Sequence, residues 1–168
     1  MHKEAHNWVE DSFREWRSKN PDTQYKVLEI GSLDINGSVR SLFNDADYYL
    51  GIDMQEGPGV DLVADAAYLV TPDLMNVIVC CEVFEHAIEW RKIVETSYHN
   101  LDKGGVFIGT CAGEGRFPHS AIDESPIRDF EYYANVGSRD MKWTLERSHF
   151  DYIMVDSINN DVRWVAVK

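Results

Sequence analysis

The sequence predicts an α/β fold: a mostly parallel, seven-stranded sheet with helices on both faces and an antiparallel terminal hairpin. Three observations predict it. Short apolar stretches of strand length alternate with stretches whose apolar residues have helical spacing. The strands are apolar throughout, as in parallel sheets that are covered on both faces. The last two β-rich stretches are separated only by "INN", which is typical of a hairpin.

The elements follow in chain order, and together they predict a single domain over residues 1–168. The first half is expected to contain a helix within residues 1–20, strands at 25–30, 47–53 and 60–66, and a helix that begins at Ser38. The second half is expected to contain a strand at 76–83, a helix at 87–100, a tight turn at 101–105, a strand at 105–113, a helix at 141–148 and the hairpin strands at 150–157 and 161–168. The irregular stretch 114–135 is too long for an idle connection, so we expect a substrate-side loop there.

Composition narrows the class of partner. The chain has 16 basic and 29 acidic residues, a net charge of −13, which argues against nucleic acid and favours a small-molecule acceptor. It contains no apolar run of the roughly 20 residues that a membrane helix needs, and no targeting signal, so we expect no membrane partner. Three cysteines make a poor disulfide framework, which favours a reduced, cytoplasmic protein. A homodimer and a partner subunit both remain open.

Three acidic residues end successive predicted strands: Glu29, Asp53 and Asp65. In open α/β sheets, ligands bind beyond the carboxyl ends of the strands, so these side chains are expected at one site. An acid after the second strand can accept hydrogen bonds from both hydroxyls of a ribose, and an acid after the third can accept from the exocyclic amine of adenine. Gly31, directly after the first strand, lets the backbone approach a ligand closely.

Motifs that bind phosphate are missing. The chain has no GxxxxGK[ST] stretch, and Leu33 stands where a GxGxxG loop would carry its second glycine, with the closing glycine displaced to Gly37. A pyrophosphate would be repelled by three nearby carboxylates. A cationic adenosine ligand without phosphate, such as S-adenosylmethionine, suits them better.

Four stretches carry a family resemblance: "VLEIGSLDINGS", "YYLGIDMQEGPGVDLVADA", "VIVCCEVFEH" and "LDKGGVFIGTCAG". In order and spacing they resemble the motifs of class I S-adenosylmethionine-dependent methyltransferases, and most of all those of small bacterial and phage members. The resemblance implies a Rossmann-like fold, S-adenosylmethionine as cofactor and S-adenosylhomocysteine as product. The acceptor would supply an O, N or C nucleophile that the motifs do not identify.

The resemblance also implies cofactor contacts. They are Glu29 and Gly31 at the methionine end, Ser32 and Gly37 in the loop, Asp53 at the ribose, Met54 flanking the adenine, Asp65 and Ala66 at the adenine edge, and Cys81 and Glu82 near the reacting methyl group.

The stretch "CEVFEH" allows two interpretations. Glu82, Glu85 and His86 have i, i+3, i+4 spacing, so we expect them on one face where a strand becomes a helix. Carboxylates and imidazoles can hold a divalent metal, and some relatives, among them small-RNA 2′-O-methyltransferases, use an "E-x-x-E-H" stretch in this way. His119 would be a fourth ligand. The favoured alternative has Glu82 against cofactor or substrate and His86 capping the helix, because many relatives without metal share the motif.

The substrate-side loop supplies the remaining candidates. His119 is the expected general base, because histidine titrates near neutral pH, and Glu82 and His86 complete the expected catalytic set. Arg116 and Arg128 could bind an acidic substrate. Two other functions stay open: a non-catalytic module that binds S-adenosylmethionine and regulates or scaffolds a partner, and a nicotinamide-dependent Rossmann enzyme.

Overall fold

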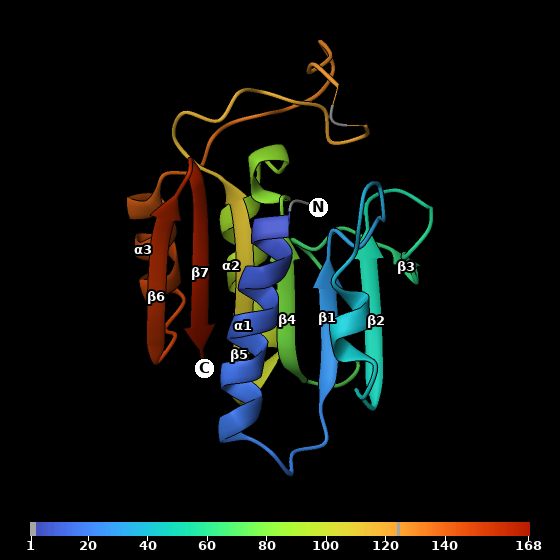
Figure 1. The fold of residues 1–168 in the computed structure, drawn as a ribbon, viewed down its shortest axis with the longest axis vertical. Coiled ribbons are helices and arrows are strands. Elements are labelled where there is room, and N and C mark those ends of the chain that lie inside the picture. Colours follow the sequence, from blue (N-terminus) through green and yellow to red (C-terminus); the bar gives the residue numbers. More distant parts are fainter. Residues whose placement is uncertain (1–2, 124) are drawn as a thin grey trace.

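The computed structural model describes residues 3–123 and 125–168. Its centre is a seven-stranded sheet with the strand order β3-β2-β1-β4-β5-β7-β6 (Figure 1). The strands are β1 (Lys26–Ile30), β2 (Tyr48–Asp53), β3 (Leu62–Val63), β4 (Met75–Cys81), β5 (Leu101–Ala112), β6 (Tyr152–Ile158) and β7 (Asp161–Val167). Strands β1 to β5 pair in parallel, and β7 pairs antiparallel with both β5 and β6. The predicted fold class and terminal hairpin are confirmed.

Helices cover both faces of the sheet. Helix α1 (Lys3–Lys19) and the short 3-10 helix η1 (Arg40–Phe43) pack on the face turned toward the viewer in Figure 1. Helices α2 (Trp90–Asn100) and α3 (Ser138–Arg147) pack on the opposite face. The apolar residues of β4 are buried on both faces of the sheet, because successive side chains of a strand point to opposite faces. Val77 and Val79 belong to the core on the α1 side, and Ile78 and Cys80 to the core on the α2 side.

An aromatic stack anchors the corner that follows β4. Phe84, in the 3-10 helix η2 (Phe84–His86), is fully buried and stacks on Trp164 of β7, with 5.0 Å between ring centroids and an interplanar angle of 6°. Gly109 of β5 makes room for this indole, because a Cβ at Gly109 would lie 2.1 Å from Trp164 Cζ2. Aromatic burial of this kind stabilises a fold strongly. The packing of Phe84 therefore fixes the position of η2, which also contains Glu85 and His86.

Two expected elements in the first half are shorter than predicted. The helix expected from Ser38 is only η1, because the loop after β1 extends to Val39 and leaves few residues before β2 begins. The strand expected at 60–66 is only β3, whose Leu62 and Val63 are both exposed. It lies at the edge of the sheet and pairs with β2 alone, so little apolar burial supports a longer strand.

The second half differs at two boundaries. Residues 101–105 are not a separate turn, because β5 begins directly after α2 at Leu101; its pairing with β4 shifts register between Met75 and Val77, which marks a bulge. The helix expected from Ala87 begins at Trp90. The irregular stretch 114–135 has no helix or strand among its described residues.

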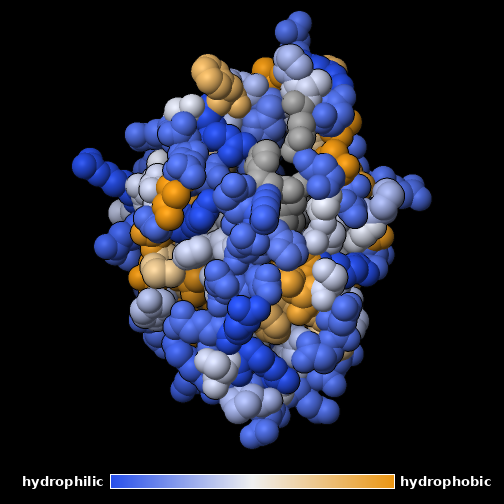
Figure 2. Space-filling view, in the orientation of Figure 1, coloured by the Kyte–Doolittle hydropathy of each residue, from blue (hydrophilic) through white to orange (hydrophobic). Residues whose placement is uncertain are grey.

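The surface is mostly hydrophilic on the face that α1 crosses, with hydrophobic residues in separate patches (Figure 2). None of the described helices is both long enough and apolar enough to cross a lipid bilayer.

Candidate functional site

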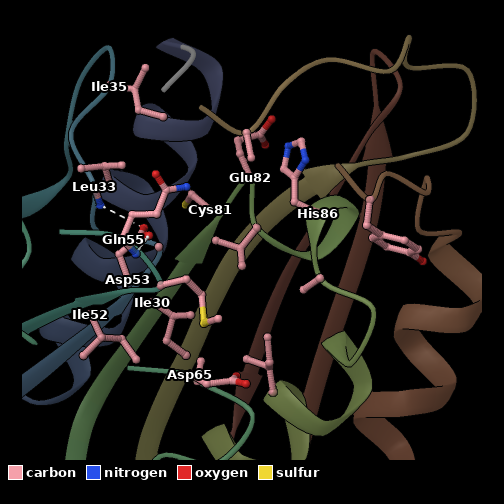
Figure 3. Close-up of a pocket in the computed structure, with 18 of the residues that line it drawn as sticks. Ile30, Leu33, Ile35, Ile52, Asp53, Gln55, Asp65, Cys81, Glu82 and His86 are labelled. Carbon is pink, nitrogen blue, oxygen red and sulfur yellow. Dashed lines mark hydrogen bonds between the residues drawn. The ribbon is translucent and has the colours of Figure 1, made fainter. Parts of the chain in front are cut away.

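A cavity of about 540 Å³ opens at the carboxyl ends of the parallel strands (Figure 3). Its walls come from the segments that follow β1, β2, β3 and β4, and from residues 119–121 and 132 of the substrate-side loop. It lies where the strand order reverses between β1 and β4, the usual ligand position in open α/β sheets. A volume of this size suits a ligand as large as a nucleoside cofactor.

The turn after β1 requires glycine at position 31. Gly31 has φ +77°, and a Cβ there would lie 2.2 Å from Cγ2 of Val83, which follows the neighbouring strand β4 and also lines the cavity. The amides of Gly31 and Ser32 both donate to the carbonyl of Ile52, at 2.9 and 3.0 Å. This turn therefore joins the ends of β1 and β2 and packs directly against Val83, which follows β4.

Leu33 belongs to an ordered variant of the loop. Its amide donates to Oδ2 of Asp53 at 3.3 Å, and its side chain lines the cavity. The amide of Gly37, which has φ +130°, donates to Oδ1 of Asp34 at 2.8 Å and closes the loop. Gly37 thus supplies a positive φ that residues with a side chain rarely adopt.

Two of the three strand-end acids line the cavity. Asp53 accepts amide hydrogen bonds from Leu33 and, at 3.0 Å, from Gln55. Asp65 accepts one from Ala67 at 2.9 Å. In Figure 3 the two carboxylates lie along the same wall, with Ile30 and Ile52 beside them. Each carboxylate oxygen can accept a second hydrogen bond, so both acids can still bind ligand hydroxyl or amine groups.

The third acid does not line the cavity. Glu29 shares a face with Val27 rather than with the cavity-lining Ile30, because neighbours in a strand point to opposite sides. It is 4% exposed, and the hydroxyl of Tyr49 donates to its Oε2 at 2.6 Å. Burial raises the pKa of Glu29 to about 7. Ser32 is also buried outside the cavity, and its Oγ has no hydrogen-bond partner.

The other expected cofactor contacts do reach the cavity. They are Gly31, Gly37, Asp53, Met54, Asp65, Ala66, Cys81 and Glu82. The three expected catalytic residues, Glu82, His86 and His119, line it as well.

Glu82 is held in an unusual backbone conformation. Its φ of +56° is rare outside glycine, and its amide donates to the carbonyl of Thr110 at 2.9 Å. Thr110 Oγ1 in turn donates to Oε1 of Glu82 at 2.9 Å, and Arg116 Nη2 lies 3.6 Å from Oε2. Strained positions of this kind are concentrated at functional sites. The shared helical face predicted for Glu82, Glu85 and His86 is wrong: Glu82 has a left-handed backbone conformation outside any helix, whereas Glu85 and His86 belong to η2. Helix α2 begins only at Trp90, so His86 does not cap it.

Glu85, His86 and His119 form a second cluster beside Glu82, with potential ligand atoms within 4.8 Å of one another. Glu85 is fully buried and accepts a hydrogen bond from the amide of Ala112 at 3.1 Å; burial raises its pKa to about 8. Burial, and the nearby His119 ring at 5.1 Å, lower the pKa of His86 to about 4. One carboxylate and two imidazoles suit a transition-metal ion. Metal binding stays the less favoured alternative, because Glu85 is fully buried and burial disfavours the charged form that would bind a metal.

The arginines of the substrate-side loop bind carboxylates of the protein itself. Arg116 pairs with Asp161 and Glu82. Arg128 pairs with two acids of its own loop, Asp123 and Glu131. The expectation that Arg116 and Arg128 bind an acidic substrate is therefore not supported, since both charges are already compensated.

Sequence reasoning missed several cavity residues. Ile35, Gln55, Ile88 and Tyr132 all line it. Ile88 carried no usable signal, because an apolar residue inside a predicted helix is normally expected in the core; the structure leaves it 72% exposed. Tyr132 stood in the predicted loop, but nothing in the sequence separated it from its neighbour Tyr133.

No protein-family model matches this sequence, and no curated protein matches it significantly. Solved structures do resemble it. An S-adenosylmethionine-dependent methyltransferase from Clostridium acetobutylicum matches with a TM-score of 0.69 and 13% identity, over 96% of this chain and 91% of that one. An amino pentose methyltransferase from Micromonospora echinaspora, solved with S-adenosylmethionine bound, matches with a TM-score of 0.69 and 14% identity, over 96% and 90%.

A third similar structure is the magnesium protoporphyrin IX methyltransferase from Synechocystis, solved with S-adenosylhomocysteine bound. Its TM-score is 0.66 and its identity 16%, over 97% of this chain and 83% of that one. The chain therefore has the fold of S-adenosylmethionine-dependent methyltransferases.

Proposed function

We propose that the cavity binds S-adenosylmethionine and that the protein transfers the cofactor's methyl group to a nucleophilic O, N or C atom of a small acceptor. One observation carries the proposal: Asp53, Asp65 and the Gly31 turn meet in a single cavity at the point where the strand order reverses. Similar structures with S-adenosylmethionine or S-adenosylhomocysteine bound support this choice of cofactor.

The strand-end acids would bind the nucleoside. Asp53 would accept hydrogen bonds from the ribose hydroxyls, and Asp65 and Ala66 would meet the adenine edge. Met54, which is 66% exposed beside them, would lie against the purine ring. Glu29 and Ser32 would stabilise the loop from behind rather than touch the cofactor.

The methionine end would follow the loop from Gly31 to Gly37 toward Cys81 and Glu82. Methyl transfer is an in-line displacement: the acceptor's lone pair attacks the methyl carbon, and the carbon–sulfur bond breaks with its electrons moving to sulfur. The protein mainly has to align the acceptor and exclude water. His119 would take the acceptor's proton where one must leave, while the uncharged His86 and the carboxylate of Glu82 orient the acceptor.

Calorimetry tests this function. S-adenosylmethionine and S-adenosylhomocysteine should both bind, and NAD should not. NAD binding without either of the other two would overturn the proposal in favour of a nicotinamide enzyme. Binding of S-adenosylmethionine without methyl transfer to a broad panel of acceptors would favour the non-catalytic module.

A further inference from the structure

The charge of the cavity limits what can bind in it. Four carboxylates line it, from Asp53, Asp65, Glu82 and Glu89, and no lysine or arginine does among the described residues. Arg116, which lies closest to Glu82, is paired with that carboxylate and with Asp161. An anionic group at this end would meet Glu82, whose nearest cation, Arg116, is already shared between two carboxylates, and like charges placed together disfavour binding strongly.

Buried polar atoms without hydrogen-bond partners, the carboxyl Oε2 of Glu85 among them, are concentrated at the same end. Oε2 of Glu82 and Nδ1 of His86 are both buried in the cavity wall without a hydrogen-bond partner. The buried Oη of Tyr133 also lacks one, and its ring lies 5.3 Å from that of His86. Buried polar atoms are nearly always hydrogen-bonded in a complete structure, so this corner calls for a ligand that carries several donors.

Apolar side chains also line the cavity. Ile88 lies two residues after His86 and Ala121 two residues after His119, Tyr132 lines the cavity too, and Ile88 and Tyr132 remain exposed to solvent. An acceptor bound here would therefore present a donor-rich group to Glu82 and His86 and an apolar body to Ile88 and Tyr132.

On the basis of the methyl-transfer function proposed above, we propose that the acceptor is a small amine with an apolar body, recognised as its ammonium form by Glu82 and His86. An ammonium carries three donors and no acceptor, so it matches both unpartnered atoms and the negative cavity. A neutral alcohol brings one donor and no charge, and a carboxylate or phosphate brings only acceptors.

The chemistry of this acceptor balances. The ammonium first loses a proton to a base, and His119 is placed for that step. The free amine's lone pair then bonds to the methyl carbon while the carbon–sulfur bond breaks onto sulfur. The products are a methylated ammonium and the uncharged thioether of S-adenosylhomocysteine.

The test compares three compounds that share a phenyl ring and a short side chain: 2-phenylethylamine, 2-phenylethanol and phenylacetate. Their binding is measured by NMR titration of the protein saturated with S-adenosylhomocysteine, with EDTA present to remove metal ions. We expect the amine to bind roughly ten- to hundredfold more tightly than the alcohol, the span of one charge-assisted hydrogen bond, and the carboxylate to bind most weakly.

Two variants locate the effect. Glu82→Gln should remove most of the preference for the amine. Asp129→Asn makes the same carboxylate-to-amide change in the substrate-side loop, at an exposed residue that does not line the cavity, and should keep the preference. Affinity for S-adenosylhomocysteine, measured on each variant, reports whether the site is intact.

The outcomes separate the two proposals. If neither cofactor form binds, the proposed function fails and this inference fails with it. If S-adenosylhomocysteine binds but the amine is not preferred, including the case in which none of the three compounds binds, only this inference is overturned. It is also overturned if Glu82→Gln keeps the preference, or if, in a separate titration without EDTA, Mn²⁺ binds at this corner and displaces the amine.

Discussion

Replacing Asp53 by alanine tests the cofactor site at its best-defined residue. The two carboxylate oxygens of Asp53 accept amide hydrogen bonds from Leu33 at 3.3 Å and from Gln55 at 3.0 Å, and each oxygen keeps capacity for one ribose hydroxyl. Hydrogen bonds to a charged group contribute about 1.5–3 kcal/mol each, but water replaces part of this loss. We therefore expect Asp53→Ala to weaken S-adenosylmethionine binding by about 1–3 kcal/mol, or roughly 5- to 150-fold in Kd.

Isothermal calorimetry measures the change, with circular dichroism as the check on folding. Asp53→Asn keeps one acceptor oxygen and should lose less affinity. Glu56→Ala is the matched control, because Glu56 is exposed three residues along and does not line the cavity. Unchanged affinity in a folded Asp53→Ala variant would refute the assignment of Asp53 to the ribose.

Three further predictions concern the surroundings of the site. The pKa of Glu29 is raised from 4.5 to about 7, so the folded state binds this proton more tightly, and the group's contribution to stability declines as pH rises from about 4.5 to 7. Glutamine carries no ionisable proton, so Glu29→Gln should raise the free energy of unfolding by about 1–3 kcal/mol at pH 8 and by almost nothing near pH 4.5. Urea titrations at the two pH values measure this gain, and an equal gain at both would contradict the prediction. Gly31→Ala should destabilise the fold by about 1–3 kcal/mol, through its positive φ and the contact with Val83, and wild-type thermal stability would count against it. Arg116→Met removes the cation beside Glu82 and leaves Asp161 with only the 4.0 Å pair to Arg163, so it should cost about 1–3 kcal/mol and increase hydrogen exchange at residues 114–120; unchanged exchange there would show that the arginine does not hold the loop.

The fold could be predicted from the sequence because its signals are local and repeated. Apolar runs such as Val77–Cys81 are strand-sized, and their burial on both faces follows from composition alone. The hairpin could also be predicted, because two adjacent asparagines separate its strands and asparagine tolerates positive φ better than most residues. In the structure, Asn159 and Asn160 both adopt positive φ in the turn. Boundaries were less predictable where tertiary pairing decides them, as at the bulge of β5.

The site was predictable where backbone position alone decides it. Asp53 and Asp65 reach the cavity because the carboxyl ends of neighbouring parallel strands meet there. Glu29 does not reach it, because the side on which a strand residue points depends on exact register. The left-handed conformation of Glu82 had no signal in the sequence, and it keeps Glu82 outside the helical turn that contains Glu85 and His86.

A crystal structure with S-adenosylhomocysteine bound is the most direct test of the central claim. The account predicts the ribose hydroxyls on Asp53, the adenine beside Met54 and Asp65, and the sulfur turned toward Cys81 and Glu82. A cavity that stays empty at saturating S-adenosylhomocysteine, or a cofactor whose ribose lies away from Asp53, would contradict it.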